Sequence, residues 1–104
     1  MVRRGDICWL EMADVGRRPV LVLTRNEALP VLRNITIAYL TRKIRDIPTE
    51  VRLGAEDGMP DECVIPLDNL RTVPRVLLSE PITSLGGPRM NEVCRALAIA
   101  TGCA

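Results

Sequence analysis

Residues 17–26 place charged and polar side chains at both ends of a short apolar run. The run itself, residues 20–23, contains only Val and Leu, which is typical of a strand buried on both faces. Arg17 and Arg18 precede it, and the polar residues 24–26 follow it. A buried strand holds the side chains at its ends still, so these residues are well placed for chemistry. Ordinary solvated strand ends would have the same composition.

Basic residues are clustered along the chain, although its net charge is only +1, from 14 Lys and Arg against 13 Asp and Glu. The clusters are Arg3-Arg4, Arg17-Arg18 and residues 42–45, which read Arg-Lys-Ile-Arg. Without an overall basic bias, any site for a polyanion must come from such local clusters. A charged, solvated surface also accounts for them. Trp9 and Tyr39 are the only aromatic residues, which argues against a protein that stacks several bases on aromatic side chains.

Histidine is absent, and this narrows the chemistry open to the chain. Its absence removes the usual general acid–base residue, histidine-ligated metal sites and nucleophiles activated by histidine. An enzyme of this composition must work with Arg, Lys, Thr, Ser, Asp, Glu or Cys. The four cysteines show no C-x-x-C spacing, so neither a zinc ribbon nor thioredoxin chemistry is indicated. Cys8 and Cys94 have apolar neighbours, and we expect both as reduced thiols in the core.

The length of 104 residues and the apolar content of 47% predict one domain, residues 1–104, with a core that needs no cofactor or disulfide. The N-terminal segment carries no apolar signal region, and no apolar run approaches membrane-spanning length. We therefore expect a cytoplasmic protein without a membrane partner.

The spacing of apolar residues predicts a mainly β protein of the α+β class, a small antiparallel barrel that ends in a helix. The helix is expected between Pro88, which suits a first turn, and Gly102, which suits the position after the last turn. Its predicted apolar stripe is Met90, Val93, Cys94, Leu97 and Thr101. The expected strands are residues 7–10, 20–23, 35–41, 49–53 and 63–65, with a sixth at 68–73 and one helical turn within 75–80.

Alternation of apolar and polar residues is clearest in residues 49–53. Thr49, Val51 and Leu53 share one face of the expected strand, whereas Glu50 and Arg52 share the other. This predicts Thr49 at the first position of the strand, with its hydroxyl at the rim of the core. A threonine that caps a strand or a turn would fit the same spacing.

Four blocks of this sequence, in this order, resemble the MazF/PemK toxin family. The blocks are Arg4-Gly5-Asp6-Ile7, residues 16–23 (Gly-Arg-Arg-Pro-Val-Leu-Val-Leu), Ile47-Pro48-Thr49-Glu50-Val51 and residues 67–72 (Leu-Asp-Asn-Leu-Arg-Thr). The end of the terminal helix, residues 97–102, also fits. The resemblance implies an SH3-like barrel, a homodimer, and an endoribonuclease that cuts single-stranded RNA without a metal ion or cofactor. It also implies a cognate antitoxin protein as partner.

The resemblance further implies a catalytic pair. The arginine of the family's R-P-V-L-V block matches Arg18, and the threonine of its P-T-x-V block matches Thr49. In RNA the substrate's own 2′-OH can attack the adjacent phosphate, so the protein needs no nucleophile. Arg18 offers a planar fork of donors to the phosphate oxygens and is a candidate proton donor, and Thr49 offers a further donor. Because an arginine pKa exceeds about 12, Arg18 is a poor general base, and the base stays unassigned.

Further residues are expected at the substrate. Arg17, Thr41, Lys43 and Asn69 are predicted to bind RNA, and the basic segment 42–45 is predicted to follow its phosphates. The loop 11–17 is shorter than in many members of the family, and Cys8 stands where an aromatic residue is often found. The recognition sequence and the mode of antitoxin binding therefore do not follow from the resemblance.

Two other functions remain open at this stage. Related gyrase-poisoning toxins are similar in fold and inhibit a protein without catalysis. An inactive family member could serve as a dimerisation protein or as a sink for antitoxin. The joint presence of Arg18 and Thr49 favours the nuclease over both.

Overall fold

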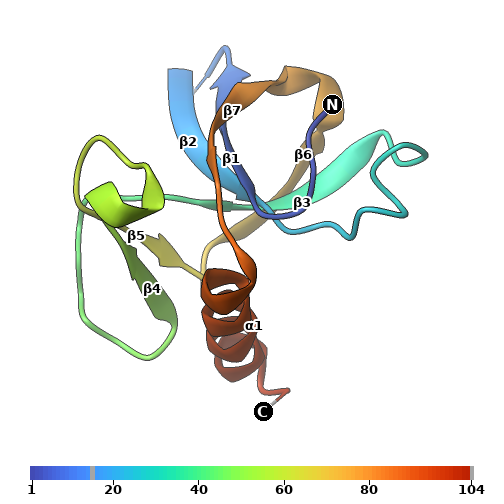
Figure 1. Ribbon diagram of the computed structural model, residues 1–104. Coiled ribbons are helices and arrows are strands. Elements are labelled where there is room, and N and C mark those ends of the chain that lie inside the picture. Colours follow the sequence, from blue (N-terminus) through green and yellow to red (C-terminus); the bar gives the residue numbers. More distant parts are fainter. Residues whose placement is uncertain (15, 104) are drawn as a thin grey trace.

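The computed structural model describes residues 1–14 and 16–103, which form two antiparallel sheets and one α-helix (Figure 1). The larger sheet has five strands in the order β6-β3-β2-β1-β7, and the smaller sheet pairs β4 with β5. The strands are β1 (Asp6–Met12), β2 (Gly16–Val22), β3 (Asn34–Tyr39), β4 (Glu50–Leu53), β5 (Cys63–Pro66), β6 (Leu70–Pro74) and β7 (Leu78–Ser84). The helices are the 3₁₀ turns η1 (Ala55–Asp57) and η2 (Arg75–Leu77) and the α-helix α1 (Gly87–Thr101).

Strand β2 is the middle strand of the larger sheet, as its apolar sequence predicts. Leu21 pairs with Ile7 of β1 on one side and with Ala38 of β3 on the other. Successive side chains of a strand point to opposite faces. Leu21 accordingly packs into one apolar cluster and Val20 into another, and both are fully buried. The prediction of a strand buried on both faces is confirmed.

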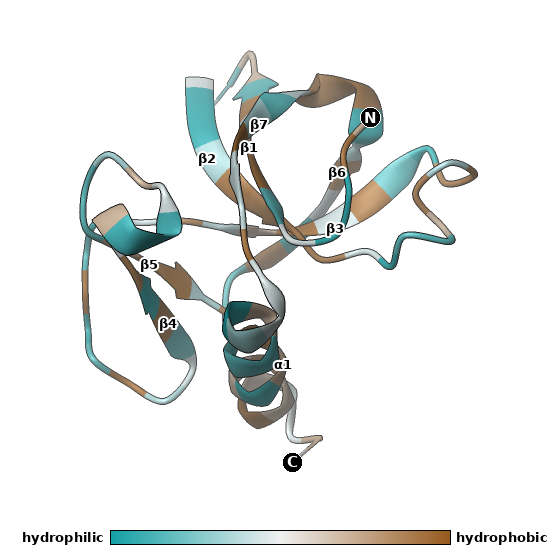
Figure 2. Ribbon diagram, viewed as in Figure 1, coloured by the Kyte–Doolittle hydropathy of each residue, from teal (hydrophilic) through white to brown (hydrophobic). Residues whose placement is uncertain are grey.

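The two apolar clusters lie on opposite faces of the larger sheet. One cluster joins this sheet to the smaller sheet and to α1, through residues such as Val51, Ile65 and Val93. The other is formed by residues of β1, β2, β3 and β6, such as Tyr39 and Val73, with Leu29 from the connection after β2. In Figure 2, β5 is brown along its length whereas β4 has both teal and brown stretches, in agreement with their burial.

The α+β class is confirmed, but the strands do not close into a barrel by hydrogen bonding. The larger sheet has β6 and β7 as its edges, and an isolated bridge between Thr41 and Val64 connects the path of β3 to β5. The two backbone hydrogen bonds of this bridge, from the Thr41 N–H to the Val64 carbonyl and from the Val64 N–H to the Thr41 carbonyl, link the two sheets at that point.

Strand β7 is absent from the sequence-based expectation. The expected helical turn is present as η2, but the chain then continues as an edge strand against β1. Its burial does not alternate, and its pairing with β1 is interrupted by register shifts. Pro81 lies inside it, which is compatible with an edge position because proline cannot donate to a sheet ladder. The sequence of β7 therefore lacks the alternation that predicts a strand.

Helix α1 begins and ends as predicted. Pro88 lies in its first turn, and Gly102, with φ of 75°, ends it by donating its N–H to the carbonyls of Ala98 and Ile99. Glycine adopts this left-handed conformation without steric cost. Among residues 1–14 and 16–103 there is no helix with the length and apolar character needed to cross a bilayer.

The expected environment is confirmed for one cysteine and wrong for another. Cys8 is fully buried, and burial, with the nearby charge of Asp6, raises the pKa of its thiol to about 11. Cys94 is exposed, because the buried positions of α1 are Val93 and Ala96. Met90, Val93 and Leu97 of the predicted stripe do pack against the core, whereas Cys94 and Thr101 are exposed and Ala96 is buried in their place.

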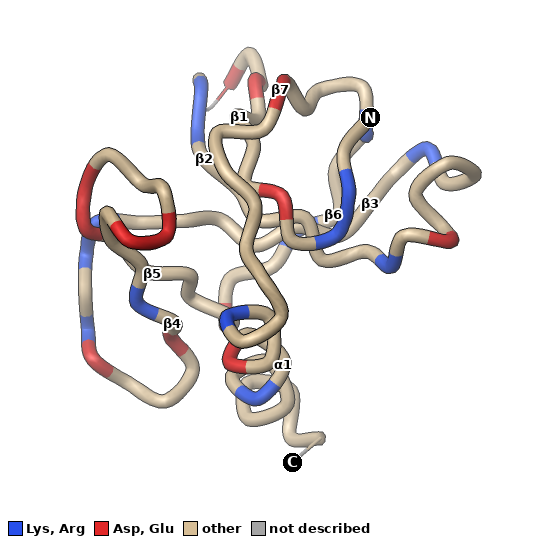
Figure 3. Tube along the Cα trace, in the orientation of Figure 1, with Lys and Arg blue, Asp and Glu red and all other residues tan. Residues whose placement is uncertain are grey.

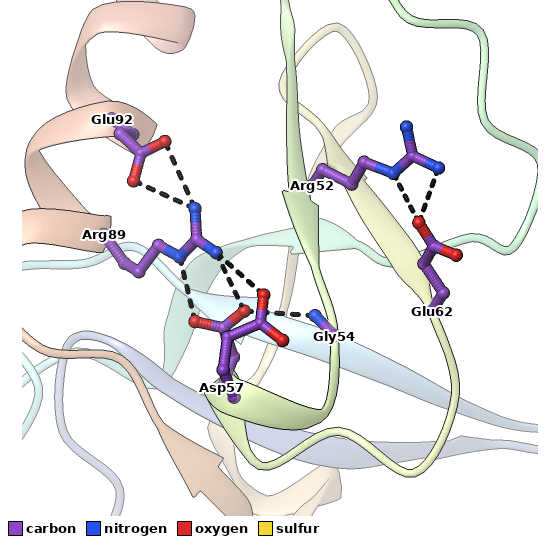
Figure 4. Close-up of polar contacts among 7 residues, drawn as sticks. Arg52, Gly54, Asp57, Glu62, Arg89 and Glu92 are labelled. Carbon is purple, nitrogen blue, oxygen red and sulfur yellow. Dashed lines mark hydrogen bonds and ion pairs between the residues drawn. The ribbon is translucent and has the colours of Figure 1, made fainter.

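Arg89 of α1 ties the helix to the η1 turn. Its Nε donates to Asp57 Oδ1 at 2.9 Å and its Nη2 to Oδ2 at 3.1 Å, while Nη1 donates to Glu92 Oε2 at 3.1 Å (Figure 4). The Gly54 N–H also donates to Asp57 Oδ2. The Asp57 side chain is only 7% exposed. The bonds from Arg89, with that from Gly54, hold the pKa of this carboxyl below its usual range, against the opposing effect of its burial.

We expect Asp57 to make folding sensitive to acid. A carboxyl whose pKa is lowered in the folded state stabilises the fold above its unfolded pKa of about 3.9, and this contribution is lost as the pH falls through the folded value. Asp57→Asn should lower the free energy of unfolding at pH 7 by about 1–3 kcal/mol, as for lost bonds to a charged group. Its loss of stability between pH 5 and 2 should be smaller than that of the wild type.

Urea denaturation at pH 7, 5, 3 and 2 measures both effects. The exposed Asp14 supplies a control, Asp14→Asn, that removes one carboxylate from the surface and should change stability by less than about 0.5 kcal/mol. An Asp57→Asn protein with the wild-type dependence on pH would contradict the assigned role of this ion pair.

Candidate active site

A small cavity of about 150 Å³ lies where β2 begins and brings several of the predicted residues together. Arg18, Thr41, Lys43 and Asn69 line it, as does Arg45 of the segment predicted to follow the phosphates. The sequence did not single out the other lining residues for the site, which are Ile47, Glu50, Pro66 and Asp68. Side chains from β2, from the connection before β4 and from the connection between β5 and β6 thus meet at one place.

Arg18 is held in a defined orientation on β2. Its guanidinium carbon lies 4.6 Å from the centroid of the Tyr39 ring, and its Nη2 donates to the Leu40 carbonyl at 3.3 Å. Arg71 in turn donates to the Tyr39 hydroxyl at 3.1 Å. A cation above an aromatic face is attracted by the ring, so the guanidinium is oriented before any ligand arrives. Tyr39 is therefore a platform for Arg18.

Thr49 reaches the cavity through Asp68. The alternation predicted Thr49 at the first position of the strand. Strand β4 instead begins at Glu50, and Thr49 lies in the turn before it. Its hydroxyl donates to Asp68 Oδ2 at 2.5 Å, and its carbonyl accepts the Leu67 N–H at 2.9 Å. Asp68 stands beside Asn69 in one of the blocks that carry the family resemblance, but its local sequence gives no sign of a contact with Thr49.

A second cavity, of about 490 Å³, shares Arg18 and Thr41 with the first. Its volume is in the range of small-ligand pockets. Arg17 belongs to this cavity and lies 4.4 Å from the centroid of the Trp9 ring, with its Nε 3.7 Å from Glu11. The other lining residues are mostly apolar, and they are Pro19, Leu40, Arg42, Met59, Pro60, Asp61, Cys63 and Ile82.

The two arginines occupy different places because they are neighbours on a strand. Successive side chains point to opposite faces, so Arg17 stacks on Trp9 of β1 while Arg18 stacks on Tyr39 of β3. Both arginines nevertheless line the larger cavity, and Arg18 and Thr41 also line the smaller one, so the two cavities adjoin and share cationic side chains. Arg42 forms an exposed ion pair with Asp61 at 2.8 Å beside the larger cavity.

Polar residues at the other end of β2 have a structural role. Thr24 Oγ1 accepts the Thr36 N–H at 2.8 Å, and Asn26 Oδ1 accepts the Arg4 N–H at 2.8 Å. The Arg4 side chain donates to the Leu23 carbonyl. Of the basic clusters in the sequence, those at 17–18 and 42–45 line the cavities, and Figure 3 shows the second as blue stretches on the connection between β3 and β4.

Two properties of the site bear on its chemistry. Cys63 lines the larger cavity, and its burial raises the pKa of its thiol, so it is a neutral group there. Within the part of the chain that the structure describes, no three His, Cys, Asp or Glu side chains come together in a group that could hold a metal ion. Metal independence remains a prediction.

Comparison with known proteins identifies the family. Residues 3–101 match the PemK-like, MazF-like toxins of type II toxin–antitoxin systems. The chain is 38% identical over 103 residues to the probable endoribonuclease MazF2 of Mycobacterium tuberculosis, which covers 98% of this chain and 100% of that protein.

Two solved structures extend this similarity to the fold. The Mycobacterium tuberculosis toxin MazF-mt6 matches with a TM-score of 0.85 and 31% identity, over 93% of this chain and 96% of that one. A mycobacterial endoribonuclease in complex with its cognate antitoxin matches with a TM-score of 0.89 and 25% identity, over 100% and 98% of the two chains. Because family, sequence and fold agree along nearly the whole chain, this protein belongs to the PemK/MazF family of type II toxins.

Proposed function

We propose that this protein is a toxin that cuts single-stranded RNA at specific sequences, without a metal ion or cofactor, and so arrests translation and growth. Membership of the toxin family supports this activity, as does similarity to MazF2, which is named a probable endoribonuclease. The observation that carries the proposal is the small cavity. There Arg18, already oriented by Tyr39, lies with Asp68, the hydrogen-bond partner of Thr49.

The proposed reaction uses the 2′-OH of RNA as nucleophile. Its oxygen forms a bond to the adjacent phosphorus while the bond from phosphorus to the 5′ oxygen breaks, which leaves a 2′,3′-cyclic phosphate and a 5′-OH. Negative charge grows on the phosphate oxygens in the transition state. Arg18 can donate two hydrogen bonds to these oxygens. Thr49 has one hydroxyl proton, which it donates to Asp68, so its part in this proposal is to orient that carboxylate.

The proton acceptor, unassigned from sequence, is Asp68 in this proposal. The cavity holds one other carboxylate, that of Glu50, and one oxygen of Glu50 already accepts two backbone N–H groups. Asp68 accepts the Thr49 hydroxyl at one oxygen and has a second oxygen for the proton of the 2′-OH. The leaving 5′ oxygen takes its proton from Arg18 or from water.

The larger cavity is proposed to hold a nucleotide next to the cleaved phosphate. It shares Arg18 and Thr41 with the reaction site, and Arg17, on its Trp9 platform, presents a planar cation there. Lys43 and Asn69 line the smaller cavity, where we assign them contacts with the phosphate or the base edges. These residues supply binding, whereas Arg18, Thr49 and Asp68 supply the chemistry.

Removing Arg18 tests the nuclease directly. Arg18→Ala should lower kcat/KM for RNA by about 10²–10³-fold, because a preorganised donor to the transition state is lost. Arg18→Lys keeps the charge without the planar fork and should recover only part of this loss. The assay incubates each purified protein with a long single-stranded RNA in EDTA and then maps the 5′ ends.

The exposed Arg25, which lies beyond the other end of β2, provides a matched control in Arg25→Ala. We expect discrete cuts with 5′-OH ends from the wild type and from this control. Full activity in Arg18→Ala would contradict the assignment. No cuts by any of the proteins would favour a toxin of the same fold that binds a protein target such as gyrase, and partner capture would then follow.

Asp68→Asn tests the proton acceptor separately from the fold. The amide oxygen of asparagine can still accept the Thr49 hydroxyl, but it cannot take up a proton. We expect kcat to fall by about 10²–10⁴-fold with little change in the melting temperature. Asp14→Asn again controls for the loss of one surface carboxylate. Wild-type kcat in Asp68→Asn would exclude Asp68 as the base.

We also propose an antitoxin partner, a homodimer and a cytoplasmic location. The solved complex of a similar endoribonuclease with its cognate antitoxin supports the first, and the cationic cavities of this chain suit an acidic segment. The edge strands β6 and β7 offer unpaired backbone that a second subunit could cover. Light scattering at micromolar concentration should give twice the mass of one chain, and a monomeric mass would contradict the dimer.

A further inference from the structure

The basic connection between β3 and β4 has no helix or strand over residues 42–49, yet it supplies two cations to the smaller cavity. Lys43 and Arg45 line the smaller cavity, and the side chains of both are exposed. A connection without secondary structure needs other contacts to hold one conformation. The contacts that fix this connection therefore decide where these two cations lie.

Glu50 supplies the main contact. Its Oε1 accepts the Arg45 N–H at 3.0 Å and the Asp46 N–H at 3.2 Å. Its own N–H donates to the Ile47 carbonyl at 3.0 Å. Glu50 is the first residue of β4 and pairs with Pro66 of β5, so the carboxylate is mounted on the smaller sheet. One side chain thus binds two successive peptide groups of the connection.

The same turn contains an unfavourable backbone conformation. Asp46 has φ of 57°, the left-handed region, and among the described residues it is the one non-glycine residue with positive φ. This region costs an ordinary residue about 1–2 kcal/mol, and Asn and Asp adopt it more readily than others. The acceptor provided by Glu50 offsets this cost, since both N–H groups at the turn point to its carboxylate.

We propose that Glu50 is a positioning residue, whose carboxylate holds residues 42–47 so that Lys43 and Arg45 stand at the cavity ready for RNA phosphates. The part that concerns RNA rests on the proposed function, whereas the part that concerns the connection does not. Arg52, on the same strand, differs from Glu50 because it forms an ion pair at 2.5 Å with the side chain of Glu62, the residue before β5 (Figure 4). Glu50 acts on backbone groups.

The residues proposed to act in the chemical step are held by contacts other than those of this turn. Arg18 lies on β2, and Thr49 is held by the bonds to Leu67 and Asp68. Releasing the connection should therefore weaken RNA binding and leave the chemical step nearly unchanged. If the binding conformation falls to about a tenth of the population, the apparent affinity falls about tenfold.

The first test compares two neutral replacements of similar length. In Glu50→Gln the amide oxygen still accepts both N–H groups, whereas Glu50→Met leaves only a thioether sulfur, which is a weak acceptor. We expect KM for RNA within about twofold of wild type in Glu50→Gln and about tenfold higher in Glu50→Met, with kcat within twofold in both. Equal KM values in the two variants would overturn the proposal, because charge alone would then explain the effect.

A second pair loosens the turn without changing Glu50. Asp46→Asn and Asp46→Val both remove one charge, but asparagine tolerates the left-handed conformation and the β-branched valine does not. Asp46→Val should reproduce the rise in KM, and Asp46→Asn should not. Two variants that behave alike would show that the conformation of this turn does not matter for RNA binding.

Amide hydrogen exchange keeps this inference separate from the nuclease assignment. The N–H groups of Arg45 and Asp46 should exchange at least about tenfold faster in Glu50→Met than in wild type or Glu50→Gln, measured by NMR without RNA. If the wild type cuts no RNA, the proposed function fails while this measurement still decides the role of Glu50. Unchanged exchange in Glu50→Met would overturn the proposal whatever the activity.

Discussion

The burial of β2 on both faces is the constraint on which the rest of the structure depends. Val20, Leu21 and Val22 have no exposed surface, and they alternate between the two apolar clusters. A shift of this strand by one residue would move every one of its side chains to the wrong face. Arg18 lies two residues before this buried run. The core therefore fixes the backbone of Arg18, although its own side chain is only half-buried.

The site combines a rigidly held arginine with cations on a less firmly held connection. Arg18 is fixed by a core strand and a buried aromatic ring, whereas Lys43 and Arg45 stand on a connection held by a few hydrogen bonds. Transition-state stabilisation needs donors placed within a fraction of an ångström, while attraction of a phosphate tolerates more movement. Five basic side chains line the two cavities together with three carboxylates, those of Glu50, Asp61 and Asp68, so the net charge of +1 conceals a locally cationic surface.

Prediction from sequence succeeded for elements that a local residue pattern specifies. It was wrong or incomplete for features that depend on packing between distant segments. The apolar run of β2 and the proline and glycine at the ends of α1 are local signals, and the corresponding elements formed as expected. Strand β7 lacks alternation and is interrupted in its pairing, so it was missed. Cys94 was assigned to the core from its apolar neighbours, but the rotation of the helix about its axis depends on what it packs against.

The sequence by itself determined the central buried strand, the arginines at its entrance and, through the absence of histidine, the kinds of catalysis that were open. Only the tertiary structure decided that Asp68 accepts the hydroxyl of Thr49, 19 residues earlier, and that Glu50 binds the turn at Asp46. The first contact forms because β4 pairs with β5 and Thr41 bridges to Val64, which brings the connections before β4 and after β5 to the entrance of β2. The second spans only four residues, but it depends on the left-handed conformation of Asp46, which periodicity does not predict. Local periodicity records burial, and it carries no information about which distant segments will meet.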